Sequence, residues 1–137
     1  MTTAVAQLER VSQQIPVFTP AHWLLRLPLA GILLHQGVTK FPLLADDAAA
    51  FGVPFFMWAL AAFGEIAVAV MLIAGAFIAN GLGNLVTRLA GVGIAVIVAS
   101  VLVIVYWAPP MDLLLGNQLH ILLIVGGLYF ALRGNAA

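Results

Sequence analysis

The sequence has no cysteine and very little charge. Only 7% of its 137 residues are Asp, Glu, Lys or Arg, whereas a soluble domain has about 25%. The absence of cysteine excludes disulfides, thiolate metal sites, iron–sulfur ligation and thiol–disulfide catalysis. The formal net charge is zero, so the charge gives no argument for nucleic acid. We therefore expect no nucleic-acid partner.

Motifs of soluble enzymes are missing as well. The sequence has no HExxH, no nucleophile elbow and no glycine-rich phosphate loop. No polar segment is long enough to house a substrate site in water. Any chemistry would therefore occur in the membrane or be supplied by a partner, and we expect no metal site.

Apolar residues dominate the chain instead. They make up 64% of it, more than a chain of 137 residues can bury in a soluble core. This composition predicts an integral membrane protein whose main partner is the lipid bilayer. Residues 1–20 are mostly polar and lack the apolar segment of a signal peptide. Val5, Leu8, Val11 and Ile15 recur there at near-helical spacing, so residues 1–20 are either a polar tail or an interfacial helix.

Four apolar stretches are long enough to cross a bilayer, which takes about 20 residues of helix. They run over 21–41, 53–78, 85–107 and 113–132. We predict an all-α polytopic membrane protein, with an antiparallel four-helix transmembrane bundle over 21–133 and a tail at 134–137. In the connections we expect a turn at 80–84 and a short helical turn capped by Asp46.

The basic residues predict the orientation. Four spans put the N-terminus, the second connection and the C-terminus on one side, with Arg10, Arg26, Arg88 and Arg133. The opposite side has Lys40, Asp46, Asp47 and Asp112. Positive charge favours the cytoplasm, so we expect both termini there, in a bacterial inner membrane.

Glu65 is the one ionisable residue within 53–78. A charge at bilayer depth costs about 2.5–3.5 kcal/mol on insertion scales, so such a residue usually has a protein partner or is protonated. Arg26 could pair with it across roughly 6 Å of depth, and a histidine could approach from the other side. We favour the pair with Arg26. A protonated Glu65 bonded to a backbone carbonyl, proton handling and quinone binding remain open.

Three further polar residues lie toward the outer side of the predicted bundle. Lys40 is at the outer boundary and shares a helical face with Arg26. His35 and His120 are about 4 Å apart in depth on different helices. Two histidines can ligate haem, but they more often bond water or backbone, and we expect no tightly bound haem. We expect Glu65 and Arg26 to form a polar centre, with His35, Lys40 and His120 lining its outer mouth.

Several short motifs follow one another in the first half of the chain. They are RLPLAG from Arg26, GVTKF from Gly37, FGVP from Phe51, Gly64-Glu65, and LIAG from Leu72. In order and spacing this stretch, about 26–77, resembles the DoxX family of small four-helix membrane proteins. The later helices match that family only in hydropathy.

The resemblance implies a small subunit of a quinone-linked respiratory or redox complex, similar to the small subunit of a thiosulfate:quinone oxidoreductase or a terminal quinol oxidase. It carries over Arg26, Lys40 and Glu65, and gives no role to His35 or His120. Catalysis would then occur only within such a complex, with quinone as a possible cofactor and protein partners or further copies of the chain around it. Two alternatives stay open: a purely structural accessory subunit, or a small proton-coupled four-helix transporter. Such transporters usually have their glutamate in the first span.

Overall fold

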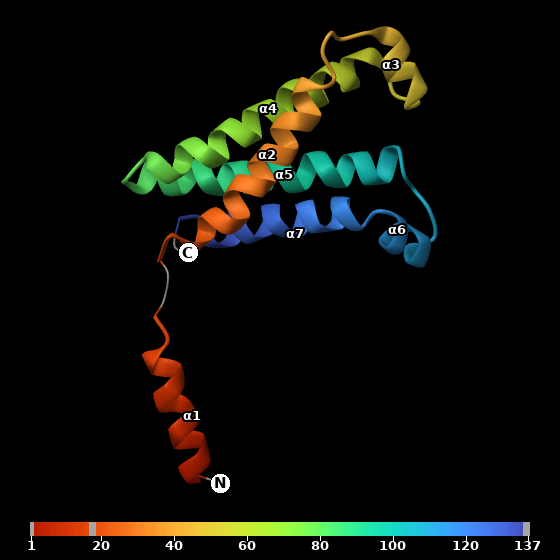
Figure 1. Cartoon of the computed structure of the whole chain (residues 1–137). Coiled ribbons are helices and arrows are strands. Elements are labelled where there is room, and N and C mark those ends of the chain that lie inside the picture. Colours follow the sequence, from red (N-terminus) through yellow and green to blue (C-terminus); the bar gives the residue numbers. More distant parts are fainter. Residues whose placement is uncertain (1, 17–18, 136–137) are drawn as a thin grey trace.

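The computed structural model describes residues 2–16 and 19–135, and within them it is helical without a strand (Figure 1). This confirms the all-α prediction. The helices, with a short 3₁₀ helix η1, are α1 (Thr2–Gln14), η1 (Thr19–His22), α2 (Trp23–Val38), α3 (Ala45–Ala50), α4 (Phe55–Phe77), α5 (Gly81–Ile104), α6 (Pro110–Gly116) and α7 (Gln118–Arg133).

Two helices, α4 and α5, are each long and apolar enough to cross a membrane. The consecutive helices α6 and α7 make a third candidate if their bend of 86° is counted within one span. The described part of the chain therefore has two to three helices with the length and composition of membrane spans, as expected of a membrane protein. Helix α2 has 16 residues and is shorter than the predicted stretch 21–41. It ends before Pro42, because a residue that precedes proline disfavours the helical conformation.

The predicted turn at 80–84 is wrong. Helix α5 already begins at Gly81, and the side chain of Asn80 caps it by accepting a hydrogen bond from Leu82 N at 3.0 Å. Asparagine is a strong N-cap residue, so the polar cluster marks a helix start. Asp46 does not cap α3 either, because the N-cap position is Leu44 and has no side-chain hydrogen bond.

The predicted fourth stretch, 113–132, is divided by a sharp bend. Helix α6 ends at Gly116 and α7 begins at Gln118, with Asn117 between them. Gly and Asn are both poor in helix interiors. The amide of Asn117 donates to Leu113 O at 3.0 Å and thereby satisfies a carbonyl at the end of α6.

Helix α4 packs against α2 on one side and α5 on the other, and α7 packs against α5 (Figure 1). Close approach of α5 and α7 depends on glycine: a Cβ on Gly127 would lie 2.8 Å from Gly91 O. Helices α3 and α6 lie at one end of the assembly, and the C-terminus and the α4–α5 connection lie at the other. Helix α1 extends away from the rest and contacts no other helix within the described chain.

Candidate functional site

The polar residues inside the helix assembly form two separate clusters. In the first, Lys40 Nζ donates to both carboxylate oxygens of Glu65, at 3.0 and 3.1 Å. In the second, Arg26 is bonded to neutral groups near the other end of α4. The expected ion pair between Arg26 and Glu65 is therefore wrong, as is a single polar centre containing both.

The direction of helical side chains explains why Glu65 pairs with Lys40. Side chains on a helix lean toward its N-terminus. The guanidinium of Arg26 follows this rule and reaches back to His22 Nδ1 at 3.2 Å, so it moves away from Glu65. Lys40 reaches back along α2 in the same way, and its ammonium bonds Gln36 O at 3.1 Å. That direction brings the ammonium toward Glu65.

Gly37 allows the two helices to come close enough for this pair. A Cβ at this position would lie 2.7 Å from Ile66 Cγ1 and 2.9 Å from Ala62 O on α4. Both distances are shorter than real Cβ contacts, and the second is to rigid backbone. Gly37 lies about one turn before Lys40, so the close contact of α2 with α4 is beside the ion pair.

The Lys40–Glu65 pair is largely removed from solvent. The Glu65 side chain is 3% exposed and the Lys40 side chain 16%. Breaking a buried ion pair by removing one partner typically costs about 3–5 kcal/mol, because the other charge is left uncompensated. Each residue of the pair therefore compensates the buried charge of the other.

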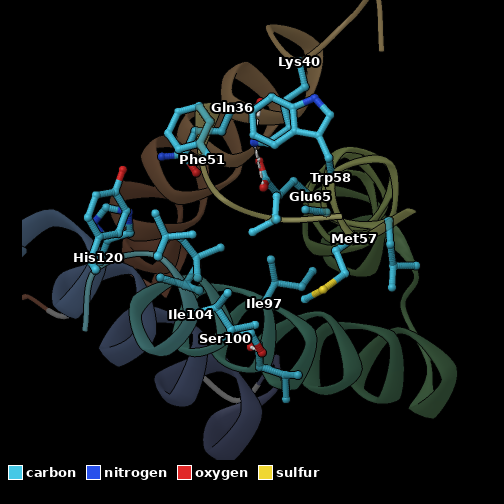
Figure 2. A pocket seen from close by; sticks show the side chains of 18 residues that line it. Gln36, Lys40, Phe51, Met57, Trp58, Glu65, Ile97, Ser100, Ile104 and His120 are labelled. Atoms are coloured by element: carbon cyan, nitrogen blue, oxygen red, sulfur yellow. Dashed lines mark hydrogen bonds and ion pairs between the residues drawn. The ribbon is translucent and has the colours of Figure 1, made fainter. Parts of the chain in front are cut away.

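Beside the ion pair is a cavity of about 410 Å³. Its walls come from the end of α2, the start of α4, the second half of α5 and the start of α7 (Figure 2). Helices α2 and α5 both pack on α4, and this space lies between the end of α2 and the second half of α5. Most of the lining is apolar; its polar members are Gln36, Lys40, Glu65, Ser100, Tyr106 and His120.

Two aromatic rings lie beside the ion pair. Phe51 stacks on Trp58 with ring centroids 5.1 Å apart, and Lys40 Nζ is 5.2 Å from the centre of the Trp58 ring. A cation at this distance is attracted to the indole face. The buried Trp58 Nε1 has no hydrogen-bond partner among the residues that the structure describes. Figure 2 shows Glu65 and Trp58 on the same side of the cavity, with Ile97 and Ile104 facing them.

The two histidines have different positions. His120 lines the cavity, and its ring is 5.1 Å from that of Tyr106. His35 is exposed on α2 and is not part of the lining. Of the residues expected at an outer mouth, the structure brings Lys40 and His120 to the cavity and leaves His35 outside it. No group of three potential metal ligands occurs within residues 2–16 and 19–135.

Arg26 is the buried centre of a densely bonded cluster. Arg26 has no exposed surface. Its Nη1 donates to Leu72 O and to Thr87 Oγ1, the latter at 3.3 Å, and its Nη2 donates to Asn135 Oδ1 at 3.0 Å. Its guanidinium carbon is also 4.8 Å from the centre of the Phe130 ring. Leu72 lies seven residues beyond Glu65, which is about 10 Å along a helix.

Asn135 joins the C-terminal end of the described chain to this cluster. Its side-chain oxygen accepts from Thr87 Oγ1 at 2.7 Å, its side-chain amide donates to Gly75 O at 2.9 Å, and its backbone N–H donates to Asn84 Oδ1 at 2.9 Å. The sequence reasoning missed Asn84, Thr87 and Asn135. Asn84 and Thr87 lie in the first two turns of α5 and Asn135 lies just after α7. No spacing in the sequence relates Asn135 to Arg26.

The comparisons with known proteins leave the family open: no family model, curated protein or solved structure matches this chain. The resemblance of residues 26–77 to the DoxX family therefore stays a prediction.

Proposed function

We propose that the chain is a four-span membrane protein that binds a quinone-type ligand in the cavity beside Lys40 and Glu65. It would serve as a small, DoxX-like subunit of a quinone-linked redox complex in a bacterial inner membrane. The observation that carries the proposal is the combination of a buried ion pair with an otherwise apolar cavity. Ligand pockets usually have this form, mainly apolar with a few placed polar groups, and volumes of about 300–1,000 Å³.

The chemistry of a quinone suits these walls. A quinone has a flat ring with two carbonyl oxygens that accept hydrogen bonds, and a long apolar tail. The ammonium of Lys40 is a charged donor at the cavity wall. Apolar side chains such as Ile97 and Ile104 line the opposite wall and offer contact to the ring. The volume suits a ring, with the tail remaining in the bilayer.

The two charged residues would have distinct roles toward such a ligand. The three N–H groups of Lys40 already donate to the two carboxylate oxygens of Glu65 and to Gln36 O. To bind a carbonyl oxygen, Lys40 would exchange one of these bonds for a bond to the ligand, and a bond from a charged donor is worth about 1.5–3 kcal/mol. Glu65 fixes the ammonium with two hydrogen bonds and balances its charge. Its carboxylate can also hold a proton next to the ligand. Electron transfer itself would come from the quinone and a redox partner.

The four-span arrangement is supported by the packing of the shorter helices. Helix α2 packs along α4, and its 16 residues correspond to about 24 Å. Helices α6 and α7 would form the fourth span together. Arg26 and Arg88 bond to residues 131–135, so these arginines and the C-terminal segment lie at the same end of the helices. Because positive charge favours the cytoplasmic side, both termini would be cytoplasmic.

A titration of purified protein with a short-chain quinone tests the ligand. Quinones quench tryptophan fluorescence, and Trp58 lines the cavity. We expect saturable quenching that weakens in Glu65→Gln and persists in Glu9→Gln. The second variant is a matched control, because it makes the same chemical change on exposed α1.

Equal quenching by both variants would contradict the proposal. Purification from native membranes tests the wider role: we expect bound quinone and a redox partner. Stoichiometric assembly into a complex without either would favour the structural subunit.

A further inference from the structure

Helix α1 exposes an apolar stripe that no other part of the described chain covers. The stripe consists of Val5, Leu8 and Val11 on α1 and of Ile15 directly after its end, with exposed fractions of 52%, 69%, 57% and 65%. At 100° per residue these positions fall on one side of the helix. Arg10 and Gln13 fall on the opposite side. The helix is therefore amphipathic, and its apolar face has no partner within residues 2–16 and 19–135.

The geometry points to the bilayer that holds the bundle as the partner of this stripe. We infer that α1 lies in the plane of the membrane surface, with Val5, Leu8, Val11 and Ile15 buried at the boundary between headgroups and acyl chains. Amphipathic helices of this kind bury their apolar face about 5–10 Å below the surface.

The first support is the continuity of this stripe with the lipid-facing surface of the bundle. Four residues, 15–18, separate α1 from η1, and four residues span at most about 14 Å. Helix α2 follows η1 directly, and its Leu24 and Leu27 are 77% and 57% exposed. In a membrane protein such side chains contact lipid. Helix α1 is thus held near the level at which the lipid-facing surface of α2 begins.

The second support is the charge on α1. Glu9 and Arg10 are its two charged side chains, and they cancel. Attraction to anionic headgroups then contributes little, and the apolar area drives binding. The inference therefore specifies a neutral mode of binding, which differs from that of basic amphipathic helices.

The absence of cysteine from the sequence makes a direct test possible. Leu8→Cys and Gln13→Cys would each give the full chain one spin-label site, on the apolar and the polar face of α1. The labelled chains are reconstituted in phosphatidylcholine vesicles, and spin-label relaxation is measured with oxygen and with a water-soluble nickel complex. We expect the label at position 8 to favour oxygen and the label at position 13 to favour nickel.

Other outcomes would overturn the inference. Nickel access at both positions would mean that α1 projects into water. Protection from both reagents at position 8 would mean that a second copy or the bundle covers the stripe. Positions 8 and 13 could differ in oxygen and nickel access only after phosphatidylglycerol is added. That result would contradict binding without attraction to anionic headgroups. None of these results depends on whether the cavity binds quinone.

Discussion

The two polar clusters differ in whether they border space for another molecule. Arg26 is fully buried, and all three of its guanidinium nitrogens donate to His22, Leu72, Thr87 or Asn135. Lys40 and Glu65 are bonded mainly to each other and border a cavity of about 410 Å³. In both clusters, hydrogen bonds offset the free-energy cost of burying charge among apolar helices. Only the second borders space for another molecule.

This difference separates a structural role from a binding role. The Arg26 cluster joins α2, α4, α5 and the segment after α7. Its hydrogen bonds therefore stabilise the packing of the helices at that end. The Lys40–Glu65 pair joins only α4 and the turn after α2. The two clusters should therefore respond differently to mutation.

The largest effect on stability is expected from breaking the Lys40–Glu65 pair. Lys40→Met leaves the carboxylate of Glu65 without a compensating charge, and Glu65→Gln leaves the ammonium of Lys40 without one. Removing one partner of a buried pair costs about 3–5 kcal/mol of stability. The double variant should recover part of this loss, because neither charge remains. Unfolding of all three in detergent, followed by circular dichroism, measures the coupling. Additive losses would show that the two residues do not stabilise each other.

A smaller loss of stability is expected for Arg26→Gln. The variant removes the donor to Leu72 O and Asn135 Oδ1, although Asn135 Oδ1 keeps its bond from Thr87 Oγ1. An unsatisfied buried group costs about 1–3 kcal/mol. Quinone quenching should be retained in the fraction that folds, because Arg26 is not part of the cavity lining. Loss of binding in well-folded Arg26→Gln would remove the distinction between the clusters.

Gly37→Ala tests whether the close approach of α2 to α4 supports the Lys40–Glu65 pair. The added Cβ would lie 2.9 Å from Ala62 O, and overpacking costs about 1–3 kcal/mol. By separating α2 from α4 it should also weaken the Lys40–Glu65 contact and reduce ligand binding. Gly31→Ala is the matched control on the same helix, because nothing lies within 4 Å of its added Cβ. Equal effects of the two variants on stability and binding would contradict the role given to Gly37.

The sequence predicted much of the fold because hydropathy and helix length are local properties. The stretch 53–78 agrees with α4 to within two residues at each end. The break between α6 and α7 could have been foreseen from Gly116 and Asn117, whereas the length of the apolar run favoured one helix. In 80–84, a helix cap and a turn have similar composition, so the start of α5 was misplaced.

The candidate site was predicted in part. Glu65, Lys40 and His120 were selected for their depth and do lie at the cavity. The partner of Glu65 was misassigned because depth was measured between backbone positions, while long helical side chains lean toward the N-terminus. Phe51 reaches Trp58 through the α3–α4 connection, and no periodicity in the sequence indicates that contact.

The most direct test of the binding role uses the fact that Lys40 is the only lysine in the chain. Acylation of Lys40 by an apolar amine-reactive ester is followed by mass spectrometry of its peptide, with decylubiquinone or with decylbenzene, which lacks the carbonyl oxygens. We expect decylubiquinone to slow the labelling in the wild type and in Arg26→Gln, and decylbenzene to have little effect. Labelling of Lys40 at the same rate with and without decylubiquinone would contradict the assignment of this cavity as a quinone site.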